Sequence, residues 1–65
     1  MTRPETIPDD TWRLVPPVIR DQLARLARSG LLVGARINRN GRVRYSIGPI
    51  RDIDGAALLR RYGQG

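Results

Sequence analysis

Arginine gives this sequence its chemical character. All 12 basic residues of the 65-residue chain are arginines, against 6 acidic residues, so the formal net charge at pH 7 is +6. The guanidinium group is a planar fork of N–H donors that matches phosphate groups and the edge of guanine. The composition therefore favours binding to a polyanion or to an acidic protein surface.

The residues on which most enzymes depend are missing. The sequence contains no Cys and no His, which excludes a disulfide framework, a thiolate zinc site, a thiol nucleophile and the commonest general base. The hydroxyl groups of Thr11, Ser29 and Ser46 have no His to activate them. We expect a protein that is not an enzyme and that needs no cofactor.

Two pairs of acidic residues would suit a magnesium ion, because hard cations prefer carboxylate oxygens. They are Asp9 with Asp10, and Asp52 with Asp54. Helix capping accounts for both pairs without a metal, so we expect no metal site.

The chain length allows one small domain with a thin core, since a chain of about 60 residues buries only about 60% of its unfolded surface. The first ten residues carry two prolines and three acids, unlike a signal peptide. The longest apolar stretch, residues 31–35, is far shorter than the roughly 20 residues of a membrane span. We expect a cytoplasmic protein with no membrane segment.

Residues 1–8 are rich in proline and poor in apolar side chains, so we expect an extended or disordered arm before a single α+β domain over residues 9–65. Residues 9–15 fit either a helical turn, N-capped by Asp9 or Asp10, or a short strand. We favour the helical turn. Trp12 should anchor the core in either case.

Pro16 and Pro17 predict the start of the main helix, because proline at the first helical position loses no hydrogen bond. Gly30 predicts its end. Apolar residues recur at helical spacing and form one stripe, namely Ile19, Leu23, Leu26 and Ala27. On the opposite face, Asp21 and Arg25 have the i, i+4 spacing of an ion pair. Arg28 lies on the same face, and Arg20 lies at its flank.

Residues 31–48 predict a β-hairpin with one of two registers. A two-residue Asn40-Gly41 turn would mix apolar and charged side chains on both faces. A three-residue loop over residues 39–41, with Gly41 in the left-handed position, instead pairs apolar residues on one face: Val33 with Ile47, Ala35 with Tyr45, and Ile37 with Val43. Burial selects the second register, because a slip of one residue would exchange the faces.

The other face of this hairpin collects positive charge. Arg36 lies opposite Arg44 and Asn38 lies opposite Arg42, with Arg39 at the tip. Like charges directly across two strands destabilise a sheet, and an external anion is the simplest compensation. The alternative is a solvated strand face in a genome biased toward arginine.

Pro49 predicts the end of the hairpin, and Asp54 predicts the N-cap of a final short helix. Ile53 and Leu58 then occupy the two positions of a hydrophobic staple. The apolar residues Ala57, Leu58 and Tyr62 form an inward stripe on this helix. Arg60 and Arg61 lie in its last turn, where cations suit the helix dipole, and Gly63 predicts its end. The predicted order is helical turn, helix, β-hairpin, helix.

Residues 18–48 resemble the recognition helix and wing of winged helix-turn-helix DNA-binding proteins. An amphipathic helix, a glycine and a basic hairpin carry the resemblance, through Leu23, Leu26, Gly30, Leu31 and Tyr45. The family implies a helix in the DNA major groove and a wing along the phosphates. It assigns contacts to Arg20, Arg25 and Arg28 on the helix and to Arg36, Arg39, Arg42 and Arg44 on the wing.

The chain departs from this family in its N-terminal part, where residues 9–15 replace two helices. Asp21 also lies where groove contacts are expected. Dimerisation would supply the missing contact area.

Two functional hypotheses follow. The first is a regulatory nucleic-acid-binding module that places an arginine-rich wing on the phosphates of duplex DNA. The second is a small inhibitor from a phage or mobile element, such as an anti-CRISPR or another anti-defence protein. That inhibitor would apply the same arginines to an acidic surface of a host protein complex.

Overall fold

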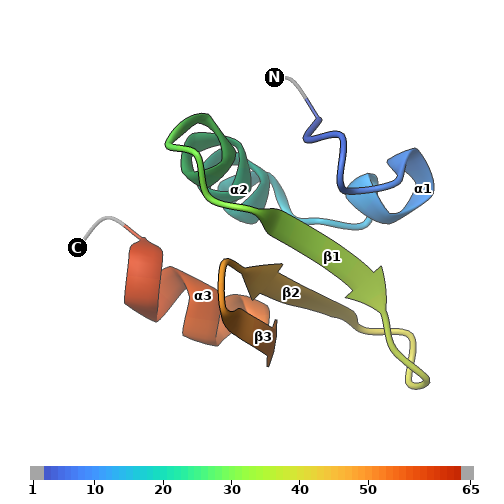
Figure 1. The fold of residues 1–65 in the computed structure, drawn as a ribbon. Helices are drawn as coiled ribbons and strands as arrows, with labels where there is room; N and C mark the ends of the chain where they lie inside the picture. The colour runs from blue at the N-terminus through green and yellow to red at the C-terminus, as the bar shows by residue number, and fades with distance from the viewer. Residues whose placement is uncertain (1–2, 64–65) are drawn as a thin grey trace.

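The computed structural model describes residues 3–63 and shows a three-stranded antiparallel sheet packed against helices (Figure 1). The strands lie in the order β1-β2-β3. The elements are α1 Asp9–Trp12, α2 Pro17–Arg28, β1 Val33–Ile37, β2 Val43–Ile47, β3 Ile50–Ile53 and α3 Gly55–Tyr62. The α+β class and the helical turn at residues 9–12 are confirmed.

The hairpin of β1 and β2 has the register that burial selected. Val33 pairs with Ile47, Ala35 with Tyr45, Arg36 with Arg44, and Ile37 with Val43. Gly41 has a φ of 80° in the three-residue loop, and the Asn38 N–H donates to the Arg42 carbonyl at 2.8 Å. The predicted apolar face is largely buried, and burial raises the pKa of the Tyr45 phenol. Ile37, at the far end of β1, is the exception and is 43% exposed.

The third strand was missing from the prediction, which ended the sheet at Pro49. Gly48 and Pro49 form a two-residue turn between Ile47 and Ile50, which are paired across β2 and β3. Gly48 has a φ of 57° at the first turn position, the place that favours glycine in a tight hairpin turn. The Gly48-Pro49 turn therefore reverses the chain direction, and β3 pairs antiparallel with β2.

Helix α2 begins and ends as predicted. Pro17 occupies the first turn, and Gly30 adopts a φ of 94° just beyond the last turn. The Gly30 N–H donates to the Ala27 carbonyl at 3.0 Å and the Leu31 N–H to the Leu26 carbonyl at 3.1 Å. This pair of bonds is a Schellman motif, which satisfies carbonyls that the helix leaves unpaired.

Two predictions about side chains on the helices were wrong. The N-cap of α1 is Pro8, while Asp9 and Asp10 lie inside the first turn, where carboxylates still suit the helix dipole. Asp21 and Arg25 do not form the expected ion pair, since the ion pairs within residues 3–63 are Arg3–Asp9 and Arg44–Asp52.

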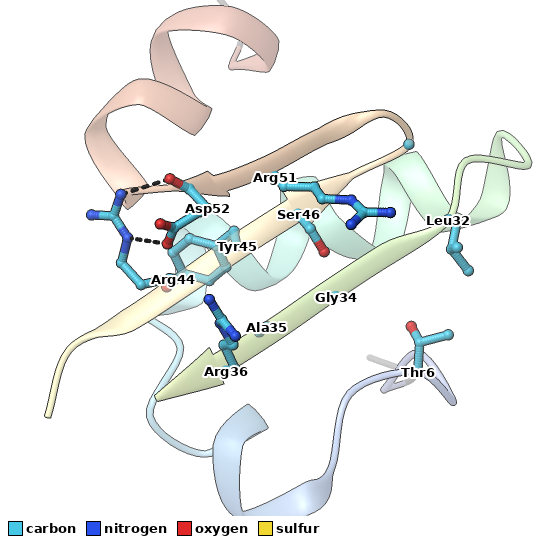
Figure 2. A pocket seen from close by; sticks show the side chains of 11 residues that line it. Thr6, Leu32, Gly34, Ala35, Arg36, Arg44, Tyr45, Ser46, Arg51 and Asp52 are labelled. Atoms are coloured by element: carbon cyan, nitrogen blue, oxygen red, sulfur yellow. Dashed lines mark hydrogen bonds and ion pairs between the residues drawn. The ribbon is translucent and has the colours of Figure 1, made fainter. Parts of the chain in front are cut away.

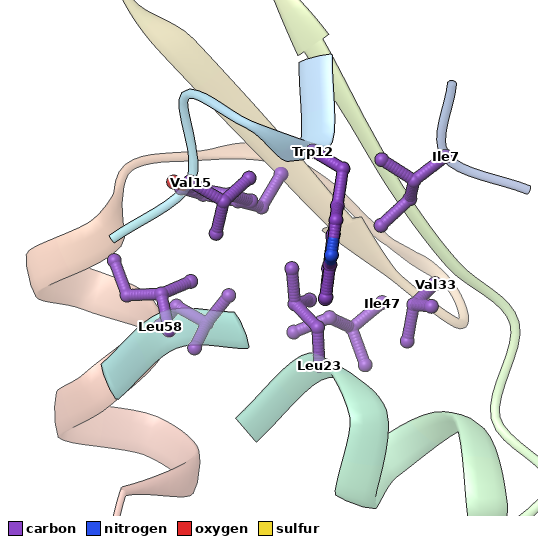
Figure 3. Close-up of a cluster of buried hydrophobic side chains, with 9 residues drawn as sticks. Ile7, Trp12, Val15, Leu23, Val33, Ile47 and Leu58 are labelled. Carbon is purple, nitrogen blue, oxygen red and sulfur yellow. The ribbon is translucent and has the colours of Figure 1, made fainter. Parts of the chain in front are cut away.

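The core lies between the sheet and α2, with α3 closing one end and α1 the other. The buried cluster is formed by Ile7, Trp12, Val15, Ile19, Leu23, Val33, Tyr45, Ile47 and Leu58. Figure 3 shows the side chains of Ile7 and Trp12 in the same cluster as Leu23 and Val33. The predicted anchor Trp12 is confirmed as a core residue, as are Ile19 and Leu23 of the predicted α2 stripe, while Leu26 and Ala27 are partly buried and pack against the cluster.

Residues 3–8 belong to this packed domain, whereas the sequence indicated an arm outside it. The side chain of Ile7 is 0% exposed. The Thr6 hydroxyl donates to the Val33 carbonyl of β1, and the Arg3 guanidinium donates to the Ile7 carbonyl. Residues 1 and 2 of the expected arm lie outside the described residues.

Asp54 caps α3 as predicted, and its carboxylate accepts a hydrogen bond from the Ala57 N–H at 2.7 Å. Asp54→Ala should lower stability by about 1 kcal/mol, because it leaves that N–H without its partner. In a domain of this size such a loss lowers the melting temperature by about 4–8 °C. Thermal unfolding followed by circular dichroism measures the effect. Asp21→Ala, at an exposed position of α2, is the matched control and should change little.

Candidate functional site

A shallow groove of about 480 Å³ lies on the face of the sheet that is turned away from the core (Figure 2). All three strands contribute to it. The residues that carry its chemistry are Gly34 and Arg36 of β1, Arg44 and Ser46 of β2, and Arg51 and Asp52 of β3. We refer to these six residues and the space above them as the arginine groove. It unites three arginines with one carboxylate.

A β-bulge in β3 explains why two consecutive side chains reach this groove. Tyr45 pairs with Ile53 and Ile47 with Ile50, so Ser46 alone faces both Arg51 and Asp52. Strand side chains normally alternate between faces, and a bulge breaks that alternation and redirects a side chain. Asp52 adopts a φ of 57°, the one positive value at a non-glycine position in the part of the chain that the structure describes. Aspartate tolerates this conformation better than most residues.

Asp52 balances one of the two arginines that face each other across β1 and β2. The Nε of Arg44 donates to Oδ1 of Asp52 at 2.9 Å, and its Nη2 donates to the Asp52 carbonyl at 2.7 Å. The sequence suggested an external anion as compensation for the facing arginines, and the fold supplies an internal one for Arg44. Within residues 3–63, neither Arg36 nor Arg51 has an acidic partner.

The two facing arginines should therefore differ in their effect on stability. Arg36→Gln removes repulsion and should leave the free energy of unfolding equal or higher. Arg44→Gln removes two charge-assisted hydrogen bonds and should lower it by about 1 kcal/mol, a figure kept small because the Asp52 side chain is 58% exposed. Urea denaturation of the two variants measures the difference. Equal stabilities would mean that the Arg44–Asp52 pair contributes nothing.

The other predicted site residues lie in three places, namely the hairpin tip, a second groove, and the contact between the start of α2 and the chain after α1. Arg39 and Arg42 are exposed at the tip of the hairpin. Arg25 and Arg28 line a second groove of about 620 Å³ beside Arg3 and Pro4. Among residues 3–63 the two grooves share no lining residue, because the inward stripe of α2 packs on the opposite face of the sheet.

Arg20 is engaged within the fold. Its Nε donates to the Val15 carbonyl at 2.8 Å and its Nη2 to the Arg13 carbonyl at 3.1 Å. Its guanidinium carbon also lies 5.9 Å from the centre of the Trp12 ring, a favourable cation–π distance. Arg20 therefore ties the start of α2 to the chain that follows α1.

Arg51 is the groove arginine that the sequence analysis did not predict, and Gly34, Ser46 and Asp52 were likewise not predicted as site residues. The signal that would have found Arg51 is the pair Ile50 and Ile53, which enclose two charged residues directly after a Gly-Pro turn. That pattern fits a short strand with a bulge. Without β3, Arg51 and Asp52 had no place in the predicted sheet.

Within residues 3–63 no group of three or more acidic residues is arranged to hold a metal ion. None of the helices described there has the length and apolar character needed to cross a membrane.

Comparison with known proteins identifies no relative: no family model, curated protein or solved structure matches this chain.

Proposed function

We propose that this protein is a non-enzymatic nucleic-acid-binding module that holds the phosphates of duplex DNA in the arginine groove. The observation that carries the proposal is the charge balance of that groove, where Arg36, Arg44 and Arg51 face a single carboxylate. Arg44 is already paired, so Arg36 and Arg51 are the two cations left to bind an external anion. Arginine donates to phosphate through two parallel N–H groups, which gives both strength and orientation.

The hairpin tip extends this surface. Arg39 and Arg42 are exposed beyond the end of the sheet and continue the positive charge along the direction of β1 and β2. A two-stranded ribbon fits the major groove of DNA, and β-ribbon proteins place strands in either groove. Arg25 and Arg28 take no part in this primary contact, because they line the second groove. The winged-helix resemblance stays a prediction.

A salt titration tests the proposal directly. A short fluorescein-labelled DNA duplex of mixed sequence is titrated with the protein at several salt concentrations, and binding is followed by fluorescence anisotropy. Each neutralised phosphate adds about 0.9 to the slope of log affinity against log salt, so contacts from two to four arginines predict a slope of about −2 to −4. Absence of binding at low salt would overturn the proposal.

A pull-down from host lysate, with and without nuclease, separates the two hypotheses. A nucleic-acid ligand predicts that the retained material is lost after nuclease treatment. A host protein complex that remains bound after nuclease treatment, combined with no binding to purified duplex, would replace this proposal with the inhibitor hypothesis.

A further inference from the structure

Gly34 is an unexpected residue for the interior of β1. Glycine weakens a strand, because it loses more backbone freedom on folding and brings no side chain to pack. The backbone does not require it here, since the glycines with a positive φ within residues 3–63 are Gly30, Gly41 and Gly48. A glycine inside a strand often marks a place where a ligand or another chain segment approaches the backbone closely.

The space that a side chain at Gly34 would fill is taken by the hydroxyl of Ser46. The two residues are direct partners across β1 and β2. A Cβ atom added at Gly34 would lie 2.7 Å from the Ser46 Oγ, which is too close for an undisturbed contact. In Figure 2 the Ser46 hydroxyl points from β2 toward Gly34. Gly34 and the Ser46 hydroxyl therefore form the floor of the arginine groove.

This hydroxyl is free to bind a ligand. Among the described residues the Ser46 Oγ makes no hydrogen bond, whereas Thr6 and Arg44, which line the same groove, both donate hydrogen bonds. Ser46 is only half-buried, so an incoming group can reach it from solvent. A serine hydroxyl both donates and accepts hydrogen bonds.

Charged donors lie on the two strands that flank Ser46 of β2. Arg36 comes from β1 and Arg51 from the bulge of β3, and both line the groove with Ser46. Asp52 is the group that would repel an anion, and its carboxylate is already bound to Arg44 at 2.9 Å. Ser46 is therefore bordered by cations on both sides, with the one carboxylate of the groove neutralised.

We propose that the floor formed by Gly34 and Ser46 seats one phosphate group of the bound nucleic acid. The Ser46 Oγ donates to one phosphate oxygen, and Arg36 and Arg51 donate to the others from the two neighbouring strands. Three donors on three adjacent strands suit a tetrahedral phosphate, whose oxygens point in several directions, better than a planar carboxylate. This inference rests on the proposed function and specifies which residues would position the ligand.

Two substitutions that change no charge test this site. Ser46→Ala removes the hydroxyl. Gly34→Ala adds a methyl group to the floor and displaces the hydroxyl, which can rotate away, so the fold should persist. Because a hydrogen bond to a charged group is worth about a factor of ten or more, each variant should bind the labelled DNA duplex about tenfold more weakly. The salt slope should stay unchanged, since no cation is lost.

Ser29→Ala is the matched control, because it removes one exposed hydroxyl at the end of α2, away from the groove. It should bind the duplex as the unmodified protein does. Thermal unfolding of every variant establishes that it is folded, and Ser46→Ala decides the question should Gly34→Ala fail to fold.

The results distinguish this inference from the proposed function. If the unmodified protein binds with a steep salt dependence and Ser46→Ala binds equally well, no phosphate sits on this floor, while nucleic-acid binding stands. If the unmodified protein does not bind the duplex at low salt, both are overturned.

Discussion

Replacing Arg36 and Arg51 together by glutamine is expected to weaken binding to duplex DNA by about a hundredfold or more at low salt. Each substitution removes a charged donor to phosphate, and such hydrogen bonds contribute about 1.5–3 kcal/mol each. The loss of two phosphate contacts should also reduce the salt slope by about 1.8. Fluorescence anisotropy at several salt concentrations measures both quantities. Neither arginine has an acidic partner within residues 3–63, so stability should be maintained.

The matched control replaces Arg60 and Arg61 by glutamine. It removes the same charge from the exposed last turn of α3, outside the arginine groove. A general attraction between a +6 protein and DNA would weaken binding equally in both double variants. Such equality would overturn the assignment of the groove, whereas a selective loss in the Arg36 and Arg51 variant supports it.

Ile7→Ala should have the largest effect on stability. Its side chain is 0% exposed and belongs to the main core cluster. Truncating a buried isoleucine costs about 2–5 kcal/mol, through lost burial and the cavity left behind. A single core in a domain of fewer than about 70 residues rarely supplies more than 3–5 kcal/mol in total. The variant should therefore be partly or fully unfolded at room temperature, as measured by urea denaturation with far-ultraviolet circular dichroism.

Val18→Ala is the control for this prediction. Val18 is 53% exposed on the first turn of α2, and substitutions at exposed positions usually change stability by no more than about 0.5 kcal/mol. If Ile7→Ala were as mild as Val18→Ala, residues 3–8 would not be part of the core. The domain would then begin at α1, as the sequence indicated.

The sequence was sufficient to predict the elements whose boundaries depend on residues close together in the chain. Pro17 marks the start of α2 because proline presets the backbone of the first turn. Gly30 marks its end because glycine adopts the left-handed conformation there. Asp54 marks the start of α3 through a hydrogen bond to a residue three positions away. The hairpin register also followed from the sequence, because alternating apolar residues can be buried together in only one register.

Contacts between distant segments could not be read from the same signals. A lone apolar residue between prolines does not show whether it is buried, and Ile7 enters the core only because the chain before α1 runs beside β1. The same limit applies to Arg20, whose partners are carbonyls exposed by the end of α1. Its charge predicted a binding residue, and the fold also gives its guanidinium two backbone partners.

The sequence by itself determined the class of the fold, the hairpin register and the excess of arginine on one hairpin face. The tertiary structure decided how that charge is arranged. By returning β3 along β2 with a bulge, the fold adds Arg51 to the groove and pairs Arg44 with Asp52. It also separates the arginines of α2 from those of the sheet. The physical reason is that a helix or hairpin depends on neighbours a few residues away, whereas a shared surface depends on how whole elements bury their apolar faces.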